Sequence, residues 1–560
     1  MKKLLSIFFI ISYLPICNNA NVVAQQAQWD WAQSFGANGS DKGNAICSDK
    51  NGNIYISGGF SSSIAFGNTA LNASGPESFF IAKFNPNGNN LWAKTLLAGW
   101  YVRGYDICCD TACNVYAIGV FNSGIVSATD TIMTYGDNDV FLIKYDSTGI
   151  EQWLNQIGGI ANDISLGGIA ADISGNVYCT GRFYSPQLFV CDDTLFSNGS
   201  SDIFLVKYNN NGNLVWELNE GGISSESGNG LIIDGNNNIY IAGKFRSQTI
   251  NFGTTVLANP TTSTSNFFLA KYNYNGEIQW AKQAFGNNRD EGWSIVCDSN
   301  NNVVVVCNSV SDSISFDSVN YIIPTILYEK IYIAKYDSSG NVLWVQSPVD
   351  HSQSKTGICL DNSNNIYISG RFKDSFYFGN ITLSGVSARN CYVAKYNPSG
   401  VAQWALSSFG SLLDEAYGIC SNVNNNLYIT GYMRSPYVAF GSDTVYNSSL
   451  NDSDVFLAKI LNQISLTDTQ QIALPQGWKI FSTYINPFEP AVDSVFSDIL
   501  PELIIMKEDV GNIYYPQYFI NTIGNLEFTE GYHIKMSSQQ TLNVIGYAAE
   551  PENTPMPLPS

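Results

Sequence analysis

Acidic residues recur at a fixed distance before one aromatic run of the chain, and this spacing raises the question of a catalytic or cation-binding site. Four of them stand 14 residues before Tyr55, Tyr240, Val304 and Tyr428, and a fifth stands 15 residues before Tyr178. Paired carboxylates can act as acid and base on a sugar. Catalysis needs two unlike environments, so a repeated acid is better explained as a brace for each repeat's loop. The candidate ligand-binding acids are Asp41, Asp163, Glu226, Asp290 and Asp414.

Two tryptophans outside the repeated positions are candidates for stacking on a sugar. Trp100 and Trp293 lie in stretches expected near the loops that carry the acids. An indole presents a large apolar face, which is what a sugar ring packs against. We therefore predict a ligand-binding surface from these two residues and the five acids. We predict no catalytic residue.

A turn of the form Asp-x-Asn-x-Asn begins at Asp49, Asp234 and Asp298. Oxygen ligands at alternate positions resemble the opening of a calcium loop. The later glutamate of that loop is missing, and Asp and Asn form such turns by bonding their own backbone. We expect no metal and no cofactor, with calcium at these turns as the alternative.

The composition narrows the classes of function. The chain has 27 basic and 47 acidic residues, a net charge of −20, which argues against nucleic acid and anionic membranes as partners. Only two histidines occur, His351 and His533, so a His-rich zinc hydrolase is excluded. There is no Gly-rich phosphate loop and no G-x-S-x-G elbow. We predict that the protein is not an enzyme.

The elements that must position these residues come from a repeat, seen most clearly over Gly357–Trp404. It reads GICLDNSNNIYISGRF and, after a variable loop, CYVAKYNPSGVAQW. The alternation in NIYISG and YVAKY has the period of a strand, and the Asn, Gly and Pro between the runs are turn residues. The tryptophan of the last run recurs every 60 to 64 residues, at Trp31, Trp92, Trp153, Trp216, Trp280, Trp344 and Trp404.

This period predicts an all-β fold, a seven-bladed β-propeller of four-stranded antiparallel blades over residues 28–462. The chain opens on a fourth strand, Trp29–Phe35, and its last repeat ends on a third strand, Val455–Ile460. We therefore expect the N-terminal strand to complete the last blade and close the ring. An "aromatic-Gly" step in the second-to-third connections, as in Phe66-Gly67, predicts an extra small hairpin.

The repeat resembles the bacterial β-propeller repeat known as SBBP, and the resemblance covers about Trp29–Ile460. The residues that carry it are the Trp strand, the "GI-x-x-D" run, "N-x-Y-x-x-G" and "A-K-aromatic". Asn422 replaces the Asp in the last copy. The resemblance implies an extracellular or surface protein and assigns no activity.

The ends of the chain differ from the repeat. Residues 1–24 are expected to be a signal peptide, with a lipoprotein acylated at Cys17 as the alternative. Residues 463–471 are expected to be a linker, and residues 472–550 a small β-rich module with a short helix at 492–500. The module is similar to C-terminal modules of surface proteins exported by the type IX route. Residues 551–560 echo its beginning, which suggests a truncated second module.

The twelve cysteines do not form an obvious disulfide framework. Cys47, Cys108, Cys359 and Cys420 occupy the same position in different repeats, where bridging is not expected, so we predict buried free thiols. Cys109 and Cys113 flank one turn and are the local pair worth testing.

The first functional hypothesis is a secreted or cell-surface, non-catalytic β-propeller that binds a protein or a glycan as a monomer. The second is a carbohydrate-active propeller, a glycoside hydrolase or lyase that uses loop carboxylates. A scaffold keeps its acids repeat by repeat, as this chain does, whereas an enzyme breaks the symmetry at a few of them.

Overall fold

The structure, a computed structural model, describes residues 27–261, 263–317, 319–322, 329–348, 356–449, 452–462, 467–481, 485–487, 491–508, 510–526 and 531–548. The predicted signal peptide at residues 1–24, His351 and the suggested second module at residues 551–560 lie outside this set. The chain divides into two compact units, one of residues 27–462 and one C-terminal to it. No helix in the described ranges is long and apolar enough to cross a membrane.

The strands of residues 27–462 fall into antiparallel sets of four, one for each sequence repeat, which we number 1 to 7 in chain order. The first strands are β2 (Lys42–Ser48), β9 (Tyr101–Cys109), β13 (Ile169–Ala171), β19 (Glu226–Ile233), β25 (Asp290–Cys297), β31 (Gly357–Leu360) and β36 (Asp414–Ser421). The second strands are β3 (Ile54–Phe60), β10 (Val115–Val126), β14 (Val177–Phe183), β20 (Ile239–Phe245), β26 (Val303–Ser309), β32 (Ile366–Phe378) and β37 (Leu427–Met433).

The third strand of each set contains the "A-K-aromatic" run, and the fourth strand contains the tryptophan run. The third strands are β6 (Ser78–Phe84), β11 (Thr131–Tyr145), β17 (Asp202–Tyr208), β23 (Asn266–Tyr272), β29 (Lys330–Tyr336), β33 (Ile381–Tyr396) and β40 (Asp454–Leu461). The fourth strands are β7 (Asn90–Thr95), β12 (Glu151–Gly158), β18 (Leu214–Glu220), β24 (Ile278–Gly286), β30 (Val342–Gln346), β34 (Ala402–Ser407) and, for repeat 7, β1 (Gln28–Phe35).

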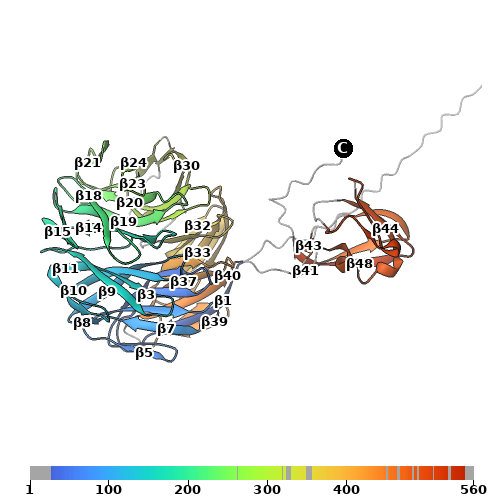
Figure 1. Ribbon diagram of the computed structural model, residues 1–560, viewed down its shortest axis with the longest axis horizontal. Coiled ribbons are helices and arrows are strands. Elements are labelled where there is room, and N and C mark those ends of the chain that lie inside the picture. The colour runs from blue at the N-terminus through green and yellow to red at the C-terminus, as the bar shows by residue number, and fades with distance from the viewer. Residues whose placement is uncertain are drawn as a thin grey trace, which may run out of the picture. The chain divides into compact units, whose positions relative to one another are not determined.

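The strand that completes repeat 7 comes from the N-terminal end of the described chain. β1 pairs antiparallel with β40, from Gln28 opposite Leu461 to Phe35 opposite Val455, and the two lie side by side in Figure 1. The Phe35 ring packs on Phe66 and Phe84 of repeat 1, with centroids 5.0 and 5.3 Å away. One strand therefore completes the last sheet and packs on the first.

A tryptophan and a lysine of one repeat donate to the same main-chain carbonyl of the next repeat. Trp153 Nε1 and Lys144 Nζ both donate to the carbonyl oxygen of Asn210, at 3.1 and 2.9 Å. This explains why both residue types recur in register. The same pairs are Trp92 and Lys83 on Ser147, Trp216 and Lys207 on Tyr274, Trp280 and Lys271 on Ser338, and Trp344 and Lys335 on Pro398.

Small hairpins follow the second strands, as the aromatic-Gly steps predict. In repeats 2 and 6 the hairpin is instead a continuation of the long second and third strands. Some separate hairpins pair with the fourth strand of the preceding repeat, as β15 does with β12 and β27 with β24, so they cover its edge. The hairpins are β4 (Ser63–Phe66) with β5 (Thr69–Asn72), β15 (Gln187–Val190) with β16 (Asp193–Phe196), β21 (Thr249–Phe252) with β22 (Thr255–Ala258), β27 (Ser313–Phe316) with β28 (Val319–Ile322), and β38 (Tyr437–Phe440) with β39 (Asp443–Tyr446). Two short strands, β8 (Leu97–Ala98) and β35 (Phe409–Gly410), complete this unit.

The C-terminal unit has two sheets around its own apolar core. β41 begins at Thr467, inside the segment expected to be a linker, because it pairs with β48 from Thr467 opposite Tyr547. The expected helix is limited to four residues, followed by a 3-10 turn. The elements are β41 (Thr467–Leu474), β42 (Gly477–Phe481), β43 (Ile485–Pro487), α1 (Val492–Val495), η1 (Leu500–Glu502), β44 (Leu503–Glu508), β45 (Ile513–Tyr515), η2 (Pro516–Tyr518), β46 (Ile520–Asn521), β47 (Tyr532–Met536) and β48 (Gln540–Ala548).

The described cysteines are free thiols, and the thiol beside Cys109 is Cys47 of the neighbouring repeat, with 3.0 Å between the two Sγ atoms. We expect a small disulfide such as oxidised glutathione to accept the two thiol hydrogens and leave a Cys47–Cys109 bond. A crosslink over a loop of this length stabilises a fold by about 2–4 kcal/mol.

Peptide mapping without reductant, combined with thermal melting with and without reductant, measures this crosslink. Cys420→Ser is the control and should crosslink normally, whereas Cys109→Ser should not. A Cys109–Cys113 peptide in place of the Cys47–Cys109 peptide would contradict the prediction.

Candidate functional site

A β-bulge recurs in the first strands, and the side chains of the bulge residues line cavities between the repeats. Asn44 has no partner on β3, because Gly43 lies opposite Gly58 and Ala45 opposite Ser57. A bulge inserts one residue and turns its side chain relative to the pleat. The same break in register occurs at Tyr105, Asn229 and Tyr417, and at Trp293 with Ser294.

The second strand approaches closely at the bulges of repeats 1, 2, 4 and 7, which explains the glycine of their "Y-x-x-G" runs, whereas repeat 5 has Cys307 at this position. A Cβ on Gly58 would lie 1.9 Å from the Lys42 carbonyl oxygen, and one on Gly431 would lie 1.9 Å from that of Glu415. No side chain fits at such a distance. In these four repeats the glycine permits the bulge, and the bulge presents the cavity residues.

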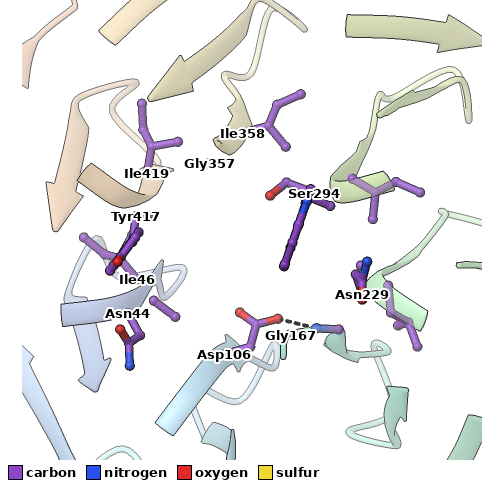
Figure 2. Close-up of a pocket in the computed structure, with 17 residues that line it drawn as sticks. Asn44, Ile46, Asp106, Gly167, Asn229, Ser294, Gly357, Ile358, Tyr417 and Ile419 are labelled. Carbon is purple, nitrogen blue, oxygen red and sulfur yellow. Dashed lines mark hydrogen bonds between the residues drawn. The ribbon is translucent and has the colours of Figure 1, made fainter. Parts of the chain in front are cut away.

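The first strands contact one another in chain order. β2 contacts β9, and contacts continue through β13, β19, β25 and β31 to β36, which in turn contacts β2. All seven repeats line a narrow inner cavity of about 130 Å³, shown in Figure 2. Its carboxylate, Asp106, accepts hydrogen bonds from the N–H groups of Gly168 and Ile169 at 2.8 and 3.3 Å.

A wider outer cavity of about 380 Å³ shares Asn44, Trp293 and Tyr417 with the inner one. Its other lining residues include three that precede a bulge, the bulge residue Tyr105 and two on second strands, and they combine cations with aromatic rings. These residues are Lys42, Arg103, Tyr105, Leu166, Arg371, Glu415 and Tyr432.

Ion pairs hold two of the outer cavity's cations. Arg103 Nε donates to Glu77 at 2.6 Å, and Arg371 Nη1 donates to Glu415 at 2.7 Å. The same carboxylate accepts a hydrogen bond from the Tyr432 hydroxyl at 3.0 Å. Oε2 of Glu415 therefore accepts from two protein donors.

The five predicted acids lie buried at the base of loops, and none of them lines either cavity. Asp414, for example, accepts from the N–H groups of Arg434 and Ser435 and from the Ser435 hydroxyl, at 3.0, 3.1 and 2.6 Å. Asp163 does the same with Tyr184 and Ser185. These contacts tie the start of a first strand to the loop after its second strand, as expected of a brace.

The two predicted tryptophans lie in different places. Trp293, on the β25 bulge, is half-buried and lines both cavities. Trp100, between β8 and β9, is 60% exposed and lines neither. The structure therefore brings only Trp293 together with the cavity residues.

Burial raises the pKa of several bracing acids. The pKa of Asp41 rises from 3.8 to about 8, although N–H groups of Ser61 and Ala37 oppose the rise, and that of Asp290 rises to about 7. Because the folded pKa of Asp41 exceeds the unfolded one, its contribution to stability is complete below pH 3.8 and is lost as the pH rises to about 8.

We therefore expect the melting temperature of the wild type to fall by several degrees between about pH 5 and pH 8. Asp41→Asn removes a titrating group and should make this fall smaller. Melting curves by circular dichroism at both pH values measure the difference. Equal falls in wild type and variant would contradict the prediction.

The Asp-x-Asn-x-Asn turns use their carboxylates within the chain. Asp234 Oδ1 accepts from the N–H groups of Asn236 and Asn238, both at 2.9 Å, while Oδ2 accepts from the Asn238 amide and the Tyr240 hydroxyl. Within the described ranges, no cluster of three or more His, Cys, Asp and Glu side chains is arranged to hold a metal ion.

Sequence reasoning missed most of the cavity residues, including Asn44, Tyr105, Arg371 and Tyr417. A usable signal exists in the repeat alignment. The position before the small residue of the first strand varies in size and chemistry, whereas its two neighbours are small residues in most repeats. A variable position inside a regular repeat is a sign of a surface that contacts something other than the repeat itself.

Comparison with known proteins agrees with this strand organisation. Residues 152–182 match the β-propeller repeat SBBP. An uncharacterized WD repeat-containing protein of Acanthamoeba polyphaga mimivirus is 24% identical over 84% of this chain, and the chain spans 41% of its length. Regulatory protein FlaEY of Caulobacter vibrioides is 27% identical over 20% of this chain and 12% of its own. The chain is a β-propeller repeat protein.

The similar solved structures are distant in sequence and have TM-scores below 0.5. A protein of unknown function from Dyadobacter fermentans is 10% identical, with a TM-score of 0.39, over 78% of this chain and 98% of its own. The WD40 β-propeller domain of Doa1 has the same identity and coverage, with a TM-score of 0.38.

Proposed function

We propose that residues 27–462 form a closed, seven-bladed β-propeller that acts as a non-catalytic binding scaffold at the cell surface. Support for closure comes from β1, which pairs with β40 and packs on repeat 1, and from the contact between β36 and β2. The protein is exported, acts as a monomer, and carries its C-terminal module as a spacer or anchor adaptor of the type IX kind.

One observation carries the assignment as a binding protein. Bracing acids and core residues repeat, but the bulge side chains change from repeat to repeat, and these are the ones that line the cavities. Repetition preserves the fold, whereas variation at one position forms a surface of specific chemistry. The outer cavity of about 380 Å³ has the size of a small-molecule site, which favours a glycan unit over a protein surface as the occupant.

The lining carboxylates support binding rather than glycan cleavage. Asp106 accepts from backbone N–H groups, and Glu415 accepts from Arg371 and Tyr432. A glycosidase needs one carboxyl free to donate a proton and another free to attack or to activate water. Both lining carboxylates are already engaged in the scaffold.

A glycan array with the whole chain, run with calcium and with EDTA, tests this function. We expect selective binding in both conditions, loss of binding in Trp293→Ala, and retention in Trp100→Ala, which removes a tryptophan outside the cavity. Bound glycans recovered intact by mass spectrometry agree with the proposal, and cleaved products would contradict it. An array with no bound glycan would favour a protein partner and overturn the glycan assignment.

A further inference from the structure

The outer cavity is basic in a strongly acidic chain. Its lining includes three cations, Lys42, Arg103 and Arg371, and one carboxylate, Glu415, while the whole chain has a net charge of −20. These cations lie on β2, β9 and β32, where β2 contacts β9 and β36, and β36 contacts β32. A local excess of positive charge at a concave site favours an anionic ligand.

Lys42 is the cation without an ion pair. Arg103 is paired with Glu77, and Arg371 with Glu415, but Lys42 forms no ion pair within the described ranges. Its ammonium lies 5.0 Å from the centroid of the Tyr432 ring. Burial and the nearby Arg103 lower its pKa, while the charges of Glu77 and Glu415 oppose the lowering. A half-buried ammonium held by one aromatic face would be stabilised by an incoming carboxylate.

The remaining lining residues suit a sugar ring. Trp293 provides a broad apolar face, and Tyr105 and Tyr417 provide smaller ones. Asn44 Nδ2 donates to the Gly104 carbonyl at 2.7 Å, which fixes the amide so that its oxygen can accept from a ligand hydroxyl. Aromatic faces, an oriented amide and an unpaired ammonium are what a hydroxylated ring with one carboxylate requires.

We propose that the outer cavity binds a hexuronate unit of an acidic glycan, with Lys42 holding the carboxylate and Trp293 stacking on the ring. This inference rests on the proposed scaffold function and specifies its ligand class. Arg103 adds to the positive field while its own hydrogen bonds remain with Glu77. The carboxylate neutralises Lys42 without breaking an existing ion pair.

Calorimetric titration of the whole chain with trigalacturonate, its methyl ester and triglutamate tests the proposal. The ester keeps the sugar and removes the charge, while triglutamate keeps carboxylates and removes the sugar. We expect trigalacturonate to bind at least about tenfold more tightly than either. Lys42→Met should weaken trigalacturonate about tenfold, with no effect on the ester or on the melting temperature, and Lys94→Met, an exposed lysine on β7, should change nothing.

The outcomes separate this inference from the scaffold function. Equal binding of acid and ester, or no effect of Lys42→Met, would overturn the carboxylate site. Equal binding of triglutamate and trigalacturonate would overturn the sugar. If trigalacturonate does not bind but the array shows a neutral glycan that requires Trp293, the inference fails and the scaffold function stands. If the array also shows no bound glycan, the inference and the glycan assignment both fail, and a protein partner is favoured.

Discussion

Deletion of residues 27–35 is expected to abolish cooperative unfolding of the propeller unit and to make the protein self-associate. The deletion removes β1, so the backbone groups of β40 that pair with it lose their partners and become a free edge. It also removes Phe35, which is 5% exposed and packs on Phe66 and Phe84. Loss of a buried phenylalanine alone costs about 3–5 kcal/mol.

Chemical denaturation and light scattering measure these two effects. Phe35→Ala should lose about 3–5 kcal/mol of unfolding free energy, while Phe196→Ala, which removes a ring that is 60% exposed on β16, should stay within about 0.5 kcal/mol. A synthetic peptide of residues 28–35 should pair with β40 and restore a monomer. A deletion variant that is monomeric and unfolds like the wild type would disprove the closing role of β1.

Asp298→Asn is expected to destabilise the protein by about 3 kcal/mol or more, whereas Asp172→Asn should cost about 1 kcal/mol or less. Both carboxylates are buried and both hold an Asp-x-x-x-Asn turn through their Oδ1 atoms. They differ at Oδ2. Asp172 accepts there from the Tyr178 hydroxyl at 3.2 Å, but Asp298 accepts from Lys335 at 2.9 Å, because Val304 stands where other repeats have tyrosine.

The chain itself contains the control for this comparison. In repeat 7, Asn422 makes the same turn, and its amide donates to the Tyr428 hydroxyl, which donates onward to Pro86. A tyrosine can therefore adapt to an amide, but a lysine cannot. The double variant Asp298→Asn with Lys335→Met should recover part of the loss, because it removes the buried charge that the single variant leaves unpaired. Equal urea midpoint shifts for the two single variants would contradict this explanation.

The strands and their register could be predicted because their signals are core residues. Tyr55, Lys83 and Trp92 recur at one period. Lys83 and Trp92 both contact the Tyr55 ring of their own repeat, and Trp92 donates to the Ser147 carbonyl of the next repeat. The cavity could not be predicted in the same way. A bulge adds one residue to one strand, and only the pairing of Gly43 with Gly58 and of Ala45 with Ser57 reveals that Asn44 is the extra residue.

Side-chain direction explains the other difference between sequence and structure. The constant spacing of Asp41 and Asp414 indicates that they serve the same role, but spacing alone does not say whether a carboxylate turns to solvent or to its own loop. Here the N–H groups of Ser61 and Ser435 determine the direction. The cations Lys42 and Arg371 were missed because their neighbours in space come from different repeats.

The carbonyl groups that receive the tryptophan and lysine bonds belong to residues of very different kinds, namely Ser147, Asn210, Tyr274, Ser338 and Pro398. Every residue type supplies a main-chain carbonyl, so the receiving turn does not have to change when its side chain does. A duplicated repeat could therefore join its new neighbour at once, without matched substitutions on the other side. This junction allows a propeller gene to grow by copying and then to diverge in its turns while the contacts between repeats persist.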